Sequence, residues 1–187
     1  MEKNSYEILL FNYYRDAELR GADLILRLIN LAENQNIQEK LARHLADATN
    51  HAWLWTERIK TIGGAPMRIN NGYHRQLRRK AGLPSKFLDL LALTCVVSER
   101  AHKRYAEHST RPDVAAKTLE ILKVMRDDEK VHLSWITDKL KDLESREGRE
   151  KVEAALHHYR KIEALVFSDM QLEEERALAK TISENPT

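Results

Sequence analysis

The feature that most constrains this chain is an internal similarity between its two halves. When the sequence is aligned with itself at an offset of 81 residues, Asp47 falls on Asp128 and His51 falls on His132. The segment HAWLWTERI, which begins at His51, matches HLSWITDKL, which begins at His132. Repeats of this kind indicate one structural unit used twice. The sequence therefore predicts two similar halves with polar residues at equivalent positions.

The first half has the pattern of two long helices joined by a tight turn. Apolar residues recur with helical spacing over residues 5–33 and again over 37–62, with Asn-Gln-Asn at 34–36 between them. Ser5 is a candidate N-cap for the first helix, and Gly63 is a candidate stop for the second. This half is expected to form an antiparallel helical hairpin.

The second half repeats this organisation after a long link. Residues 63–84 contain several glycines and prolines and are expected to form a crossover with a short helix inside. Helical patterns then cover 85–108 and 113–143, separated by a break that contains Pro112. A further amphipathic pattern over 149–180 is expected to cover the bundle or to meet a second subunit in a homodimer.

Composition agrees with an all-α protein. The chain has 187 residues, of which 32% are charged, with only six glycines and four prolines. Short turns within each pair and one long link between the pairs are typical of a four-helix bundle with a single crossover. We expect one domain over 1–187, with the bundle in 5–143 and the additional helix in 149–180.

Charge and cysteine content exclude several classes of protein. The formal net charge is only +2, too balanced to indicate a nucleic-acid or membrane surface by itself. Cys95 is the only cysteine, so a disulfide framework is impossible and the cytoplasm is the expected compartment. The sequence has no run of eighteen uncharged apolar residues and no signal-peptide pattern at its start, so no membrane association is expected.

One local cluster departs from this balance. Residues 67–86 carry basic side chains and no acidic one, at Arg68, His74, Arg75, Arg78, Arg79, Lys80 and Lys86. A solvated connection is the ordinary interpretation. The alternative is a surface for an anionic partner such as tRNA, a phosphorylated metabolite or an acyl-carrier protein.

The repeat also predicts where polar side chains meet. Glu18 precedes His51 by 33 residues, and Glu99 precedes His132 by the same separation. In each hairpin the turn between the two helices lies about midway between the glutamate and the histidine. Both residues are therefore roughly 22 Å from the turn and lie at the same height in the bundle. Glu129 lies three residues before His132 and shares its helix face. The five side chains are therefore expected to converge in the middle of the bundle.

Three carboxylates and two imidazoles in one place favour iron or manganese. Burying several carboxylates without a cation would raise their pKa values and cost several kcal/mol, which a bound metal removes. We therefore predict a metal site formed by Glu18, His51, Glu99, Glu129 and His132.

This pattern resembles the ferritin-like di-iron carboxylate superfamily, in which a glutamate followed by DExxH occurs twice. Glu99 with DEKVH at 128–132 matches the second half of the pattern. Glu18 with DATNH at 47–51 matches the first half, except that Ala48 stands where the family has a bridging glutamate. The likeness extends over roughly residues 5 to 143, and the departure at Ala48 weakens or empties one of two metal positions.

The resemblance implies a ferritin-like four-helix bundle with a C-terminal fifth helix. It also implies two iron ions, or an iron and manganese pair, that activate O2 or peroxide as in small oxygenases and tRNA-modifying hydroxylases. In the family pattern Asp47 and Asp128 orient the histidines. With one half-site empty, a single iron ion would bind.

The leading hypothesis is an oxidoreductase that oxidises or hydroxylates an organic substrate, either a small molecule or a carrier-bound one. A separate reductase would supply electrons. Tyr14 and Cys95 are equivalent in the repeat and are candidates to line the substrate pocket, with core packing as the alternative. The alternative functions are a scaffold whose metal site has decayed and, with less support, an iron store.

Overall fold

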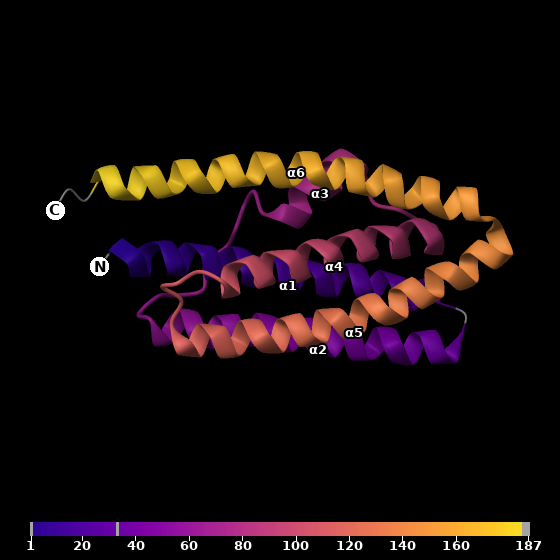
Figure 1. Ribbon diagram of the computed structural model, residues 1–187, viewed down its shortest axis with the longest axis horizontal. Coiled ribbons are helices and arrows are strands. Elements are labelled where there is room, and N and C mark those ends of the chain that lie inside the picture. Colours follow the sequence, from indigo (N-terminus) through magenta and orange to yellow (C-terminus); the bar gives the residue numbers. More distant parts are fainter. Residues whose placement is uncertain (1, 33, 185–187) are drawn as a thin grey trace.

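Helices make up nearly all of the chain in the computed structural model, which describes residues 2–32 and 34–184 (Figure 1). Within these ranges there are six helices and no strand. The fold is thus all-α, as predicted. In chain order the helices are α1 (Glu2–Leu31), α2 (Gln35–Thr61), α3 (Tyr73–Ala81), α4 (Phe87–Ser109), α5 (Ala116–Glu147) and α6 (Arg149–Glu184).

In the first hairpin, α2 begins and ends next to the residues predicted to stop or cap a helix. Asn34 caps α2, its side-chain oxygen accepting the backbone N–H of Ile37 at 3.3 Å. Gly63, with a φ of +83°, follows the end of α2 in a conformation that favours glycine. The prediction that Ser5 caps α1 is wrong, because α1 already begins at Glu2.

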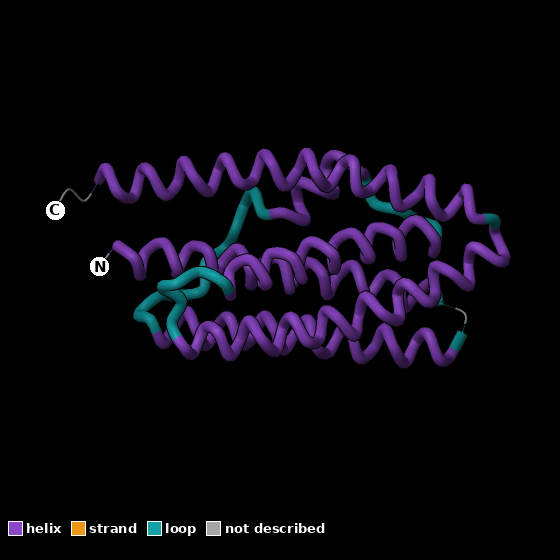
Figure 2. Tube along the Cα trace, viewed as in Figure 1, coloured by secondary structure: helices purple, strands orange, loops and turns teal. Residues whose placement is uncertain are grey.

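The helices form three layers, which Figure 1 shows from the side. α2 and α5 lie side by side at the bottom, α1 and α4 lie above them, and α6 lies across the top with α3. The link from α2 to α4 contains α3 and runs the length of the bundle, whereas the other connections are short (Figure 2). The four-helix bundle with one crossover and a C-terminal helix is therefore confirmed.

The C-terminal helix covers the bundle. Gly148, with a φ of +96°, forms the sharp corner between α5 and α6. From there α6 runs back over α4 and α3 and buries Val152, Tyr159, Val166 and Met170. The apolar stripe predicted for this helix is thus buried within the chain.

The bundle interior has two hydrophobic clusters. One, near the free ends of α1 and α6, includes Phe11, Trp55 and Leu122. The other, toward the α5–α6 corner, includes Leu41 and Ile136. Between them lies a layer of buried polar side chains, which includes Glu18, His51 and His132.

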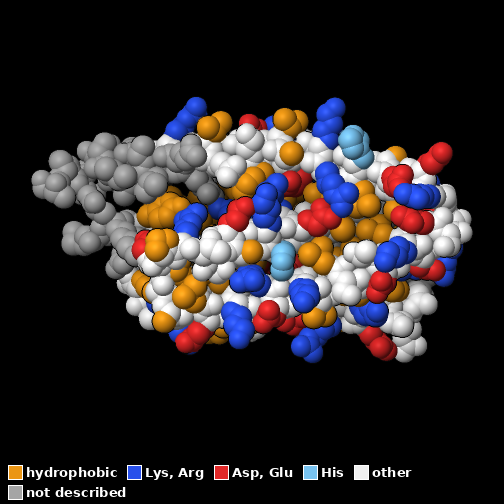
Figure 3. Space-filling model, viewed as in Figure 1, with side chains coloured by type: hydrophobic (Ala, Val, Ile, Leu, Met, Phe, Trp, Pro, Cys, Tyr) orange, Lys and Arg blue, Asp and Glu red, His pale blue; other side chains and the backbone are white. Residues whose placement is uncertain are grey.

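The face in Figure 3 carries basic and acidic side chains interspersed over the helices, with hydrophobic side chains between them. No helix in the described part of the chain is long and apolar enough to cross a membrane.

Candidate metal centre

The polar layer is formed by side chains from α1, α2 and α5. Glu18 projects from α1, His44 and His51 from α2, and Glu129 and His132 from α5. Each is at most 7% exposed. Because positions 44 and 51 are two turns apart, and positions 129 and 132 are one turn apart, each pair shares a helix face. Four of these five residues were predicted from the sequence, and the fifth, His44, was not.

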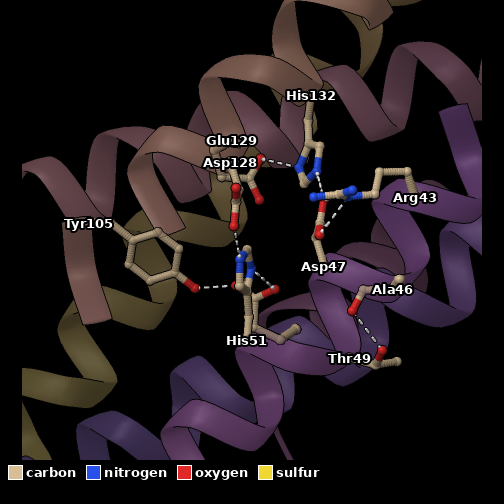
Figure 4. A network of polar contacts seen from close by, with 10 residues as sticks. Arg43, Ala46, Asp47, Thr49, His51, Tyr105, Asp128, Glu129 and His132 are labelled. Carbon is tan, nitrogen blue, oxygen red and sulfur yellow. Dashed lines mark hydrogen bonds and ion pairs between the residues drawn. The ribbon is translucent and has the colours of Figure 1, made fainter. Parts of the chain in front are cut away.

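Each of the two equivalent histidines is held by an aspartate from the other hairpin (Figure 4). His51 donates from Nε2 to Asp128 Oδ2 at 2.9 Å, and His132 donates from Nε2 to Asp47 Oδ2 at 3.1 Å. Asp47 is fixed in turn by Arg43 at 3.2 Å. With the outer nitrogens engaged, both rings present Nδ1 to the interior, the arrangement usual for metal-binding histidines.

The inner nitrogens face glutamates. His51 Nδ1 lies 3.3 Å from Glu18 Oε2, and the other oxygen of Glu18 accepts a hydrogen bond from the Tyr105 hydroxyl on α4. His132 Nδ1 lies 3.7 Å from Glu129 Oε2, which is too far for a good hydrogen bond. The first histidine thus has a full set of partners, while the second has an open inner position.

Three buried polar atoms at this open position lack a hydrogen bond among the described residues. They are Nδ1 of His44, Nδ1 of His132 and Oε2 of Glu129. Each orphaned atom would cost about 1–3 kcal/mol if nothing satisfied it. A cation would accept electron pairs from all three, so the donor set fits a metal ion.

The donors form two groups that share Glu129. In one group ligand atoms of His44, Glu129 and His132 lie within 4.8 Å of one another, and in the other those of Glu18, His51 and Glu129 do. A carboxylate has two oxygens and can contact both positions. The layer therefore offers two adjacent groups of donors for a cation, and Glu129 belongs to both.

The electrostatics of the layer favour positive charge. Burial by itself would lower the pKa of His51, but Glu18 and then Asp128 outweigh it and raise that pKa to about 9. At His132, burial by itself would lower the pKa, but Glu129 and then Asp47 outweigh it, so this pKa is also raised. His44, with no carboxylate bonded to it, has its pKa lowered well below the usual value by burial and by the other two histidines.

Glu99, predicted as a ligand, lies outside both groups. Its oxygens accept hydrogen bonds from Arg160 on α6, at 3.0 Å from Nε and 2.5 Å from Nη2. It would have to leave this ion pair to reach a metal. The sequence pattern did not predict this ion pair, because Arg160 lies on α6, outside the two segments that align at the 81-residue offset.

His44 was not among the residues predicted as ligands. Its equivalent at the 81-residue offset is Met125, so the repeat does not mark it. The available signal was its position four residues before Ala48, on the face that also carries His51. Its ring stacks on that of His132 with centroids 3.6 Å apart.

A cavity of about 60 Å³ adjoins the polar layer. Glu18, His44, Ala48 and Glu129 line it on one side, and helices α3, α4 and α6 close the other. One water needs only ~10–15 Å³, so the cavity has room for more than one water-sized group. The small side chain of Ala48 leaves this space beside the donors.

Of the two residues predicted to line a substrate pocket, Tyr14 and Cys95, only the first lies at this cavity. Tyr14 lines the cavity, whereas Cys95 is not among its lining residues and packs in the hydrophobic cluster toward the α5–α6 corner. Burial, with Glu99 nearby, raises the pKa of the Cys95 thiol to about 12. Cys95 is therefore a neutral core thiol.

Comparison with known proteins bears on the fold. No protein-family model matches the sequence, and no curated protein matches it. Among solved structures, the chain is similar to a dodecameric thioferritin, the bacterioferritin-related protein of Bacteroides fragilis, with a TM-score of 0.63 and 18% identity. The likeness covers 79% of this chain and 90% of that one. Together with the helix order and the crossover, it shows that this protein has the ferritin-like fold.

Proposed function

We propose that the polar layer binds two divalent metal ions, preferably iron, and that the protein uses them to oxidise an organic molecule. The observation that carries the metal site is the trio of orphaned atoms on His44, Glu129 and His132, beside a second donor group that shares Glu129. Both the imidazole and the carboxylate donors suit iron, and manganese fits the same set.

Charge balance supports a cation in the layer. The carboxylates of the layer are Glu18, Glu129 and the two aspartates that hold the histidines, and among the described residues only one of these, Asp47, is paired with an arginine, Arg43. Divalent cations would offset the negative charge that remains. Without cations, the layer keeps its buried carboxylates partly compensated by protonated histidines, which is costly.

The cavity beside Ala48 supports chemistry on an organic substrate. Iron held by these side chains would supply O2-dependent oxidation chemistry, and hydroxylation of a C–H bond would consume one O2, two electrons and two protons to give the alcohol and water. The two electrons would come from a separate reductase. The Tyr105 hydroxyl holds Glu18 in place, and the walls of the cavity keep bulk water away from the reacting atoms.

A second candidate function is oxidation of iron for storage, which rests on the likeness to a dodecameric thioferritin. Size-exclusion chromatography distinguishes the two. A large assembly that takes up many iron atoms per chain would favour storage, and a monomer or dimer with two would favour substrate oxidation. A scaffold with a decayed site would take up none.

Anaerobic titration of the metal-free protein with ferrous iron tests the proposal directly. We expect saturation at two ions per chain, followed by O2 consumption on exposure to air. His44→Ala should lose one of the two ions, while His157→Ala, which changes an exposed histidine on α6, should lose neither. Failure of the unmodified chain to bind iron or manganese in stoichiometric amount would exclude the metal centre.

A further inference from the structure

A second pocket lies beside the cavity of the candidate metal centre. It has a volume of about 320 Å³ and is bounded by α1, α3 and the first half of α4. Its polar lining is mostly basic, with Arg20 from α1 and His74, Arg75 and Arg78 from α3. The basic cluster noted in the sequence thus contributes to the wall of a pocket.

The pocket keeps a positive charge after its ion pairs are counted. Asp23 lines it but is paired with Arg27 at 3.2 Å, and Asp16 behind it is paired with Arg20 at 3.5 Å. Burial raises the pKa of the Asp16 carboxyl, and the positive charges of Arg20 and Arg75 partly oppose this rise. Arg78 makes no ion pair within the described part of the chain. With two carboxylates against four arginines, the pocket attracts an anion.

The pocket and the cavity share a wall. Leu24 and His74 belong to the lining of both. Gly21, on the cavity side, is close to His74, since a Cβ on this glycine would lie 4.0 Å from the imidazole ring. Burial lowers the pKa of His74 to about 4, so the ring is neutral near pH 7 and adds no charge to this boundary.

The two spaces differ in chemistry. The outer pocket presents guanidinium groups, together with Leu77, Leu83 and Leu93. The inner cavity is mostly apolar and reaches the metal-binding side chains Glu18 and His44. A molecule that fills both has a charged end held at the surface and an apolar end beside the metal.

We propose that the substrate of the metal centre is an amphipathic organic anion. Its carboxylate or phosphate group binds Arg75 and Arg78, and its apolar part extends past Leu24 and His74 into the inner cavity. This inference rests on the proposed function for its reactive end, while the anion pocket stands on its own residues.

Calorimetric titration of the metal-free full chain tests the pocket without relying on the metal. The probes are hexyl phosphate, hexanoate, inorganic phosphate and hexylamine. We expect the two alkyl anions to bind and hexylamine not to bind. Arg75→Gln with Arg78→Gln should weaken the binding of the alkyl anions at least tenfold. The matched control is Arg68→Gln with Arg79→Gln, which removes two exposed arginines of the same crossover outside the pocket lining and should change nothing.

A second variant tests the path to the metal. Gly21→Leu places a side chain against His74, so it should reduce the affinity for hexyl phosphate to that for inorganic phosphate and leave the latter unchanged. Circular dichroism checks that each variant is folded. The difference between hexyl phosphate and hexanoate then identifies which anionic group the arginines prefer.

Several results would overturn the inference. They are equal binding of hexylamine, an unaffected Arg75 and Arg78 double variant, or equal affinity for inorganic and hexyl phosphate in the unmodified chain. Iron uptake without binding of either alkyl anion would also overturn it while leaving the metal centre intact. Anion binding without iron uptake would support the pocket and contradict the metal centre.

Discussion

His44 and Ala48 lie one turn apart on the face of α2 that points into the bundle, and together they set the character of the candidate centre. At Ala48 the family pattern has a glutamate, and here a cavity opens beside the methyl group instead. At His44 an imidazole with an orphaned nitrogen approaches Glu129 and His132. The layer therefore has three imidazoles and two carboxylates as candidate inner donors.

Restoring the glutamate tests this interpretation of Ala48. In Ala48→Glu we expect the metal-free protein to lose about 1–3 kcal/mol of unfolding free energy, because the new carboxylate is buried without a partner. Ferrous iron or manganese should then raise the melting temperature more than in the unmodified protein, since it gains a ligand. Differential scanning fluorimetry with and without metal measures both effects. If the melting temperature of Ala48→Glu were the same with and without metal, position 48 would not face a metal.

Asp128 offers a second test at the residue scale. Asp128→Asn keeps a hydrogen-bond acceptor for His51 but removes the charge that holds the ring as a metal ligand, so metal affinity should fall about 10–100-fold. Asp138→Asn, on an exposed position of the same helix, is the matched control. Competition with a coloured chelator gives the affinities. Equal losses in both variants would argue against an orienting role.

At the scale of helices, α6 does more than cover the bundle. Glu163 on α6 receives two hydrogen bonds from Arg100 on α4, at 2.6 and 2.9 Å, and one from the Tyr73 hydroxyl on α3 at 3.2 Å. These contacts tie three helices together around the cavity, to whose lining Arg100 and Tyr73 belong. Because α6 lies outside the two sequence segments that align with each other, this packing could not be inferred from the sequence.

Breaking this junction should cost stability. Glu163→Ala leaves the Arg100 guanidinium, whose side chain is 18% exposed, without its partner, and we expect a loss of about 3 kcal/mol of unfolding free energy. Urea denaturation measures the change. Glu153→Ala, which removes an exposed partner of Arg149 on the same helix, should leave stability nearly unchanged. If the contacts of Glu163 did not stabilise the fold, Glu163→Ala and Glu153→Ala would have similar urea denaturation curves.

The helices themselves were largely predictable, because their apolar spacing and turn residues are local signals. The turn at Asn34 lies where the sequence predicts it, and the corner at Gly148 falls between the helices predicted over 113–143 and 149–180. The position of Glu99 was not predictable, since it depends on which neighbour a helix face meets after folding. The same limit applies to His44, whose role follows from the packing of α2 against α5.

At the scale of the whole molecule, acid should weaken the fold through buried neutral histidines. His108 is 4% exposed, bonded to the Tyr14 hydroxyl at 3.1 Å, and has its pKa lowered to about 4 by burial, then by Arg111 and Arg104. Its pKa when unfolded is about 6.5, so between these values the unfolded chain binds a proton that the folded chain does not. This contribution is present above pH 6.5 and is lost as pH falls toward 4.

We therefore expect His108 to account for about 2 kcal/mol of the stability lost between pH 7 and pH 5. Urea denaturation of the metal-free protein at both values, compared with His108→Gln, isolates this share from that of other histidines. The glutamine retains a partner for Tyr14 and does not titrate. An identical pH dependence in the two proteins would contradict the assignment.

The two-ion centre can be tested with a crystal structure of protein loaded anaerobically with ferrous iron, with anomalous scattering recorded at the iron edge. We expect two iron peaks in each chain, one contacting His44, Glu129 and His132 and the other contacting Glu18, His51 and Glu129. A polar layer that remains free of iron, or iron bound only at surface carboxylates, would contradict it.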